Sequence, residues 1–414
     1  MNLAFFIARR TAQHTPGNKP GVMERIAVIS VALSVAVMIL AMAVIMGFKR
    51  EVAHKVTAFS AHAVVTGIRG AGTLDSQPVR RSARTEAMIR STEGFASMAP
   101  YAVKGGIVRT ADAVGEVMLK GVDTAYDWSA FREWLVDGDL PRVGDSLRTK
   151  DILLSRNLAD RLMLGVGDRV EMLFVEADDT PRRDRFKVAG IYSSGMDEMD
   201  NTVIMTDLRN VQRLADWAPD EISGYEIFTA DLSRADDFAR RLGHELLYDD
   251  ADETANLAVS SVTELHANIF DWLKAHDVNA AVIIVIMLVV AFFNMTSALL
   301  ILVLERTRMI GLLKAFGMHN AMLRQVFLWR AAFITLRGLA WGNAVGLGLC
   351  LLQRYFHLVK LDSEGYLLSE VPVSLGWGWW LALNIGVVAA IVALLVVPTC
   401  IVSSVKPDES IRYE

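Results

Sequence analysis

Three acidic residues behind a Ser-Ser-Gly segment are the first candidates for chemistry in this sequence. Asp197, Glu198 and Asp200 follow that segment, which occupies positions 193–195. Two neighbouring carboxylates can divide the acid and base roles of a hydrolytic reaction. The same residue types are also typical of a solvated turn, and we favour the turn.

No other set of residues has the spacing of a catalytic or metal site. The sequence contains no Gly-x4-Gly-Lys-Ser/Thr, His-Glu-x-x-His, Cys-x-x-Cys or Gly-x-Ser-x-Gly. His54 and His62 have no carboxylate or cysteine partners at ligand spacing. Cys350 and Cys400 both lie in apolar stretches, so we expect two buried small side chains rather than a redox pair. We therefore predict a chain that is no enzyme and binds no metal or cofactor of its own.

The composition and four long apolar stretches indicate a membrane protein. Of the 414 residues, 53% are hydrophobic and 21% are charged. A spanning helix needs about 20 predominantly apolar residues. The stretches that meet this length are 26–48, 278–304, 331–352 and 377–402. They predict an α-helical membrane protein with four transmembrane helices.

Lysine and arginine near the span ends set the predicted orientation, because cytoplasmic loops carry the excess of these residues. They are abundant in 1–25 and in 305–330, and outnumbered by acids in 353–376. The segments 1–25, 305–330 and 403–414 are therefore expected in the cytoplasm, and 49–277 and 353–376 on the opposite, outer side of the membrane. Trp377, Trp379 and Trp380 are expected at the outer membrane interface.

The segment 49–277 is predicted to be an α+β periplasmic domain with two subdomains and a boundary near residue 150. Alternating and β-branched runs predict strands, and apolar periodicity predicts helices. The strands are expected at 63–67, 106–109, 117–122, 169–175 and 185–192, the helices at 155–164, 236–242 and 261–274, and a polar hairpin tip at 176–184.

Small and polar residues inside the spans predict how the helices pack. Gly338, Gly342 and Gly346 recur every four residues, a spacing that lets another helix approach closely. Asn294, Asn343 and Asn384 each lie in a different span and are expected to bond across the bundle or to meet a substrate. Arg337 lies inside the third span and is expected to extend to the cytoplasmic headgroups.

The segment 305–327, ERTRMIGLLKAFGMHNAMLRQVF, connects the second and third spans on the cytoplasmic side. It predicts a short amphipathic helix that stops at Gly317. Such a helix, held between two spans, can insert into a groove of a soluble partner. A basic helix lying at the lipid surface is the alternative that the residues alone leave open.

This segment resembles the cytoplasmic coupling region of ABC permeases of the MacB/FtsX superfamily, whose pattern is roughly E-x-x-x-E-I-[GA]-[IL]-L-[KR]-A-x-G. The chain as a whole is similar to the lipoprotein-releasing permeases of the LolC/LolE type. The matching segments are FIARR at 6–10, MGF at 46–48 with Glu51, LS…LA at 154–159, LGVGD at 164–168, FKVAGI at 186–191, SGM at 194–196 with Asp200, AFFN at 291–294 with Ser297, and DESIRYE at 408–414.

The resemblance implies a type VII ABC permease that extracts triacylated lipoproteins from the outer leaflet and passes them to a periplasmic carrier like LolA. A separate cytoplasmic ABC ATPase like LolD would bind ATP and magnesium. The membrane part would act as a dimer, with a second copy or a sister subunit, and no nucleic acid is involved. The residues expected to couple to the ATPase are Glu305, Arg308, Ile310, Leu313, Lys314, Phe316 and Gly317.

Two further sites follow from this expected function. Flexible methionines and aromatic rings of the first two spans are expected to line a lipoprotein cavity. They are Met38, Met42, Met46, Phe48, Met287, Phe292 and Phe293. The hairpin residues Thr180, Pro181, Arg182 and Arg183 are the candidates for carrier docking, although this hairpin is short and charged where C-type subunits have a longer one bounded by prolines.

Three other classes stay open at this point. A transmembrane signal transducer like FtsX would share the coupling segment. An efflux permease like MacB usually has a fused N-terminal ATPase, for which only about 25 residues precede the first span here. A membrane adhesin or receptor would have no use for the coupling segment.

Overall fold

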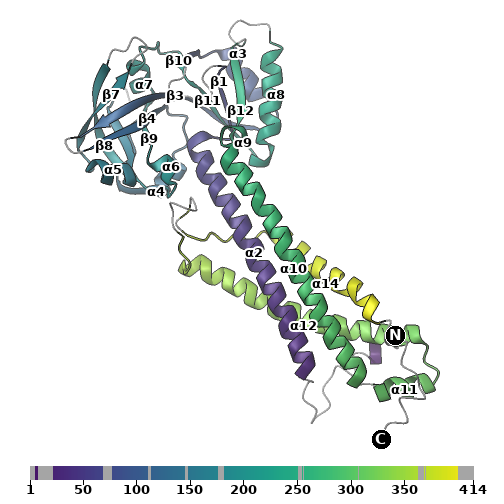
Figure 1. The fold of residues 1–414 in the computed structure, drawn as a ribbon. Helices are drawn as coiled ribbons and strands as arrows, with labels where there is room; N and C mark the ends of the chain where they lie inside the picture. The colour runs from purple at the N-terminus through teal and green to yellow at the C-terminus, as the bar shows by residue number, and fades with distance from the viewer. Residues whose placement is uncertain are drawn as a thin grey trace. The chain divides into compact units, whose positions relative to one another are not determined.

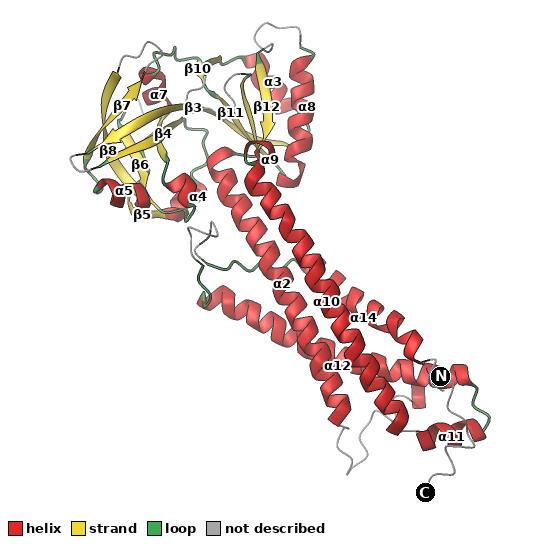
Figure 2. Ribbon diagram, viewed as in Figure 1, coloured by secondary structure: helices red, strands yellow, loops and turns green. Residues whose placement is uncertain are grey.

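The computed structural model describes residues 5–7, 22–68, 77–110, 113–144, 148–175, 181–249, 254, 256–305, 307–361, 368 and 370–399. The chain divides into two compact units. Unit 1 comprises Met1–Arg50, Leu273–Lys360 and Glu370–Glu414, and unit 2 comprises Glu51–Trp272 and Leu361–Ser369. Helices build unit 1, whereas unit 2 combines strands and helices (Figures 1 and 2).

Five helices carry the described residues of unit 1 beyond residue 21. They are α2 (Val22–Ser60), α10 (Ala267–Glu305), α11 (Thr307–Ala315), α12 (Asn320–Phe356) and α14 (Trp377–Thr399), of which α2 and α10 continue into unit 2. Three are long and apolar enough to cross a membrane, over Glu24–Ser60, Ala267–Ser297 and Asn320–Phe356. The fourth predicted span falls on α14, where the apolar helix described over Trp377–Ala393 is shorter.

Three glycines hold α12 directly against α2. A Cβ atom on Gly338 would lie 2.7 Å from the Cβ of Val31, and one on Gly342 would lie 2.8 Å from the carbonyl oxygen of Ala32. At Gly346 a Cβ would lie 3.2 Å from the Cα of Ala36. No larger side chain fits at these separations, so the predicted close-packing role of the glycines is confirmed.

Side-chain amides join the other helices of unit 1. Asn343 of α12 donates to Asn384 of α14 at 2.6 Å, and Trp380 Nε1 donates to Asn343 at 2.7 Å. Asn294 of α10 donates to Ser30 of α2. All three asparagines therefore bond between helices, as structural contacts that satisfy polar groups in an apolar environment.

An acidic side chain near the start of α2 binds two arginines of α12. Glu24 accepts from Arg330 at 3.2 Å and from Arg337 at 3.0 Å. The guanidinium of Arg337 thus points toward the start of α2 and binds a carboxylate that the sequence analysis did not name as its partner, while its expected position at the headgroups stays a prediction. A carboxylate in the first turn also suits the positive end of the helix dipole.

The helices α2 and α10 run antiparallel in unit 1 (Figure 1). Besides Ser30 and Asn294, the ring of Phe48 stacks on His276 with centroids 5.8 Å apart, and Lys49 pairs with Asp277 at 2.7 Å. The segment 370–376 then crosses α2, since the Ser374 amide donates to the Ala43 carbonyl oxygen at 3.0 Å. A Cβ on Gly47 would lie 2.5 Å from the carbonyl oxygen of Pro372, which explains a glycine there.

Unit 2 is built on twelve strands among the described residues. They are β1 (Ala63–Gly67), β2 (Val79–Arg80), β3 (Phe95–Arg109), β4 (Val114–Val122), β5 (Leu135–Gly138), β6 (Asp151–Ser155), β7 (Arg169–Val175), β8 (Pro181–Tyr192), β9 (Val203–Asp207), β10 (Glu221–Ile222), β11 (Gly224–Thr229) and β12 (Leu257–Ser261). The helices are α3 (Ala83–Ser91), α4 (Ser129–Trp134), α5 (Arg156–Leu162), α6 (Asp197–Asp200), α7 (Leu208–Leu214), α8 (Ala235–Leu247) and α9 (Val262–Leu265).

The long strand β3 belongs to two parts of one sheet. Its first half pairs with β11, which continues through β1 to β12. Its second half pairs with β4 and, at its end, with β7, so that β3-β4-β9-β6-β8-β7 closes into a ring (Figure 2). Residue 150, where the sequence suggests a boundary, lies inside the ring part, between β5 and β6, which both pair with β8.

The strands and helices expected from the sequence are present, but several of their bounds differ. The strand β3 begins at Phe95 rather than 106, α8 extends to Leu247, and the helix expected at 261–274 divides into α9 and the start of α10. The strand β8 begins at Pro181 rather than Arg185, because the residues 181–184 pair with β7. The predicted hairpin tip 176–184 is therefore shortened to the connection 176–180. Buried aliphatic and aromatic side chains from both parts of the sheet form one continuous core.

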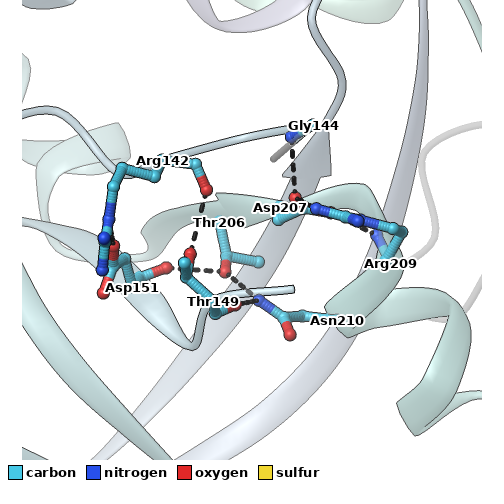
Figure 3. Close-up of polar contacts among 8 residues, drawn as sticks. All are labelled: Arg142, Gly144, Thr149, Asp151, Thr206, Asp207, Arg209 and Asn210. Atoms are coloured by element: carbon cyan, nitrogen blue, oxygen red, sulfur yellow. Dashed lines mark hydrogen bonds and ion pairs between the residues drawn. The ribbon is translucent and has the colours of Figure 1, made fainter. Parts of the chain in front are cut away.

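A polar network holds the segment around residues 142–151 against the ring (Figure 3). Asp207 caps α7 through the Arg209 amide at 2.8 Å and also accepts from the Gly144 amide at 3.0 Å. Asn210 donates to the Thr149 carbonyl oxygen at 2.9 Å. Burial alone would raise the pKa of Asp207, but the paired Arg209 guanidinium and these amide donors together outweigh it and hold that pKa below its usual range.

We expect Gly342→Val to destabilise the chain by about 1–3 kcal/mol, because the added methyl groups overpack the contact between α12 and α2. Gly348→Val is the matched control, since a Cβ on Gly348 meets nothing within 4 Å. Thermal unfolding of the two purified full-length variants in detergent measures the difference. Equal losses in both would contradict the close-packing role.

Candidate functional site

The coupling segment folds as α11 and a tight glycine turn. The Met318 amide donates to the Leu313 carbonyl oxygen at 3.0 Å, and the Gly317 amide donates to the Lys314 carbonyl oxygen at 2.9 Å. This pair of bonds is the Schellman motif, in which the residue after the helix takes positive φ. Gly317 has φ +86°, and Leu313 and Met318 both pack on the apolar core of unit 1. The predicted stop at Gly317 is thus confirmed and has a backbone cause.

Two faces of this segment differ in exposure. Ile310 is fully buried and Leu313 is half-buried, so both fasten α11 to unit 1. Phe316 is 85% exposed, and Leu312, one helical turn earlier, is 55% exposed. Residues four apart share one helix face. We define Leu312 and Phe316 as the exposed apolar pair.

Sequence reasoning named Phe316 but missed Leu312, although the four-residue spacing was visible. Lys314 is half-buried. The side chains of Glu305 and Arg308 lie outside the described part of the structure, so their expected coupling role stays a prediction. Ile310 and Leu313 position the segment, whereas the exposed apolar pair is what a partner can touch.

The expected cavity residues occupy several different environments in unit 1. Met42 and Met46 line a hollow of about 20 Å³ with Ile39, Leu375 and Trp379, among others. Met38 is fully buried in the core and Phe48 is buried on His276. Met287 and Phe292 are half-buried, and Phe293 is 62% exposed. The structure thus brings Met42 and Met46 to one hollow, together with residues of the 374–383 segment that the sequence analysis did not assign to a cavity.

The candidate docking residues on the β7–β8 hairpin form ion pairs. Arg182 pairs with Asp216 at 2.8 Å and donates to the Leu214 carbonyl oxygen at 3.2 Å. Arg183 lies 3.7 Å from Glu171 and is the more exposed of the two arginines. Thr180 and the side chain of Pro181 lie outside the described residues.

Of the three acidic residues behind the Ser-Ser-Gly segment, Asp200 is buried and forms a hydrogen-bonded latch, whereas Asp197 is half-buried and Glu198 is exposed. Asp200 is 1% exposed, and its carboxylate accepts from Ser194 Oγ at 2.6 Å and from the amides of Ser194 and Gly195 at 3.1 and 3.2 Å. Its backbone carbonyl accepts from Ser155 Oγ. The solvated-turn prediction is therefore wrong for Asp200. Hydrogen bonds from Ser194 and Gly195 to both of its carboxylate oxygens give the SGM segment and Asp200 a structural role.

Burial sets the ionisation of this latch. Burial raises the pKa of Asp200 to about 6, against the opposing effect of its hydrogen bonds and of Lys55. Among the described residues, no group of three or more His, Cys, Asp or Glu is placed to hold a metal ion.

Two models of known families match the chain and identify it as a membrane permease with a MacB-like periplasmic core domain. The model of the MacB-like periplasmic core domain matches residues 26–244, and that of the FtsX-like permease C-terminal domain matches residues 281–407. The chain belongs to this MacB/FtsX permease superfamily.

Within the superfamily, the chain is a homologue of the LolC and LolE permeases. It is 24% identical to the lipoprotein-releasing system transmembrane protein LolC of Xylella fastidiosa strain Temecula1, over 94% of this chain and 93% of that one. It is 24% identical to LolC of Neisseria meningitidis, over 94% of each chain, and 21% identical to LolE of Haemophilus influenzae, over 91% of each.

Two solved domains are also similar. The extracellular domain of YknZ matches 48% of this chain and 98% of its own at 14% identity and a TM-score of 0.32. The periplasmic region of MacB from Actinobacillus actinomycetemcomitans matches 50% of this chain and 92% of its own at 13% identity and a TM-score of 0.33.

The raised pKa of Asp200 predicts a specific pH dependence of stability. The folded chain holds this proton more tightly than the unfolded chain, so the stabilisation is complete below about pH 4 and is lost as pH rises through about 6. The shift from 3.8 corresponds to about 3 kcal/mol. Thermal unfolding of the full chain between pH 4 and 7 should show this loss, and Asp200→Asn should abolish it.

A second variant separates this latch from a general acid effect. Ser194→Ala removes a hydrogen bond that favours the ionised carboxylate, so the loss of stability should extend to higher pH than in the wild type. An unchanged profile in both variants would rule out Asp200 as the titrating group.

Proposed function

We propose that the chain is a permease subunit of an ATP-driven complex that extracts lipoproteins from the outer leaflet of the inner membrane and passes them to a periplasmic carrier. The observation that carries the proposal is the similarity to LolC and LolE over more than nine-tenths of the chain. A separate ABC ATPase hydrolyses ATP in this scheme, and the permease part is a dimer with a second copy or a sister subunit.

The topology proposed for this function has four spans. The three long helices cross the membrane, and α14 is the fourth span. The termini and α11 then face the cytoplasm, and unit 2 lies in the periplasm. The concentration of lysine and arginine around α11 supports this orientation.

The exposed apolar pair, Leu312 and Phe316, is the proposed contact with the ATPase. Large apolar side chains in contact with water are favourable to cover. A rigid helix face with one aromatic anchor fits a groove on a soluble partner. Because the Schellman turn and the buried Ile310 fix α11 to unit 1, a displacement of Phe316 by the partner is transmitted to the membrane helices.

The hollow lined by Met42 and Met46 is the proposed place for an acyl chain. At about 20 Å³ it holds little more than a water molecule, so an acyl chain requires it to open. Exposing an acyl chain to water costs about 0.8 kcal/mol per CH2 group, which reaches tens of kcal/mol for three chains. A sheltered apolar path and ATP-driven opening are both needed. Of the hairpin residues, Arg183 is the proposed contact with the carrier.

We expect Phe316→Ser to weaken ATPase binding by at least about 30-fold, since central aromatic anchors contribute about 2 kcal/mol or more. Leu312→Ser should weaken it in the same direction. Co-purification with the ATPase and titration of the purified partners measure the effect. Tyr355→Ser is the matched control, because Tyr355 is an equally exposed aromatic residue at the far end of α12. Unchanged binding by Phe316→Ser would exclude this contact.

We expect Met42→Gln and Met46→Gln to reduce lipoprotein release while ATP hydrolysis continues, because a polar amide in the hollow disfavours an acyl chain. The assay is transfer of a triacylated lipoprotein from vesicles to the carrier. Leu33→Gln is the control, since Leu33 is an exposed residue of the same helix. If it impairs release as much as the two methionine variants do, the hollow has no special role.

A further inference from the structure

The outer end of α2 is held by three side chains of unit 2. The last carbonyl groups of a helix have no partner within the helix. The Tyr126 hydroxyl donates to the Ala58 carbonyl oxygen at 2.8 Å, and Lys120 Nζ donates to that of Phe59 at 2.5 Å. Ser60 Oγ lies 2.8 Å from His266 Nε2, which precedes α10. The end of the helix is thus held from the strand β4, from the connection between β4 and α4, and from the residue between α9 and α10.

The lysine in this cap belongs to a buried ion pair. Lys120 on β4 is 2% exposed and Glu226 on β11 is 3% exposed, with Lys120 Nζ and Glu226 Oε1 2.5 Å apart. The strand β3 separates the two, so the pair spans the middle of the sheet. The rings of Tyr101 and Tyr126 lie 5.7 and 5.4 Å from Nζ. The ammonium group therefore has no contact with bulk water and is surrounded by selected partners.

Such a pair is a poor means of stabilising a fold. Removing two charges from water costs free energy that their attraction only partly returns, and apolar replacements of similar volume are often neutral or stabilising. A buried charge instead provides geometric specificity, because its hydrogen bonds are satisfied in only one arrangement of its partners. Here that arrangement includes a carbonyl of α2.

The apolar contacts around the same helix end have no comparable direction. Phe59 packs on Phe131, Trp134 and Tyr192, with centroids 5.3, 5.8 and 6.2 Å apart. Apolar burial is non-directional, so these rings permit α2 to rotate or slide by small amounts. The bond from Lys120 to one carbonyl oxygen fixes the depth and rotation of the helix.

We propose that Lys120 is the positioning residue that fastens the end of α2 to the sheet, with Glu226 holding it in place, so that a movement of α2 is carried into unit 2. This inference rests on the proposed function, in which ATP hydrolysis moves the helices of unit 1. Lys120 touches no substrate and acts only through α2. Its removal uncouples ATP hydrolysis from lipoprotein release without unfolding the chain.

Two double variants test the fastening in the full complex with its ATPase. Lys120→Met with Glu226→Leu removes both charges and keeps the volume. Lys120→Glu with Glu226→Lys keeps a buried pair but turns a carboxylate toward the Phe59 carbonyl oxygen. We expect both to retain ATP hydrolysis and to release fewer lipoproteins per ATP, and the first to have a thermal midpoint no lower than the wild type. Deuterium exchange at the amides of residues 57–61 should accelerate about tenfold, the size expected for one lost charged hydrogen bond.

The outcomes separate this inference from the proposed function. Wild-type release per ATP and wild-type exchange in the Met–Leu variant would overturn the fastening, as would full release by the reversed pair, since the charge pair alone would then suffice. Retained hydrolysis with lost release and faster exchange supports it. If the wild-type complex itself releases no lipoprotein, the proposed function fails, and the exchange measurement still decides whether Lys120 holds α2.

Discussion

The close approach of α12 to α2 is the contact on which unit 1 depends. Because Gly338, Gly342 and Gly346 carry no side chain, the two backbones meet, and van der Waals packing acts over several turns. Their closeness brings Arg330 and Arg337 within reach of Glu24. On its other side α12 is joined to α14 by the hydrogen bond from Asn343 to Asn384. Because α12 is held in place, α11 is attached to a fixed helix, and the turn at Gly317 keeps Phe316 exposed to solvent.

The same helix, α2, contributes to the core of each unit. Its residues from Ala27 to Ala43 pack in unit 1, and Phe59 packs in the aromatic cluster of unit 2. In unit 2 the surrounding structure is rigid for its own reasons: β3 belongs both to the open part of the sheet and to the closed ring, so neither part moves without the other. Hydrogen bonds from Ser194 to both carboxylate oxygens of Asp200 fix the connection between β8 and β9.

Local patterns in the sequence predicted several elements correctly, whereas other strands and the contacts between distant residues were not predicted. The glycine spacing in α12, the stop at Gly317 and the strand 63–67 need only neighbouring residues, and all are confirmed. The pairing of Arg337 with Glu24 was not foreseen, because the two residues lie 313 positions apart. Asp200 was placed in solvent because a run of Ser, Gly and acids looks the same whether or not Ser155 closes over it. The pair of Lys120 and Glu226 was invisible for the same reason, since two strand residues 106 positions apart carry no mutual signal.

The distribution of polar contacts along α2 follows from what each region must do. Its middle part packs through small and apolar side chains, where no buried charge has to be satisfied and the helix is free of directional bonds to α12. Near its two ends, Glu24 is bound by two arginines and the Ala58 and Phe59 carbonyls are bound by Tyr126 and Lys120. Further polar contacts lie between these ends, at Ser30, Ala43 and Lys49. The helix's own hydrogen bonds keep the distance along its axis between these contacts constant. The buried charges are therefore placed where they specify position, and the apolar surface is placed where it only has to exclude water or lipid.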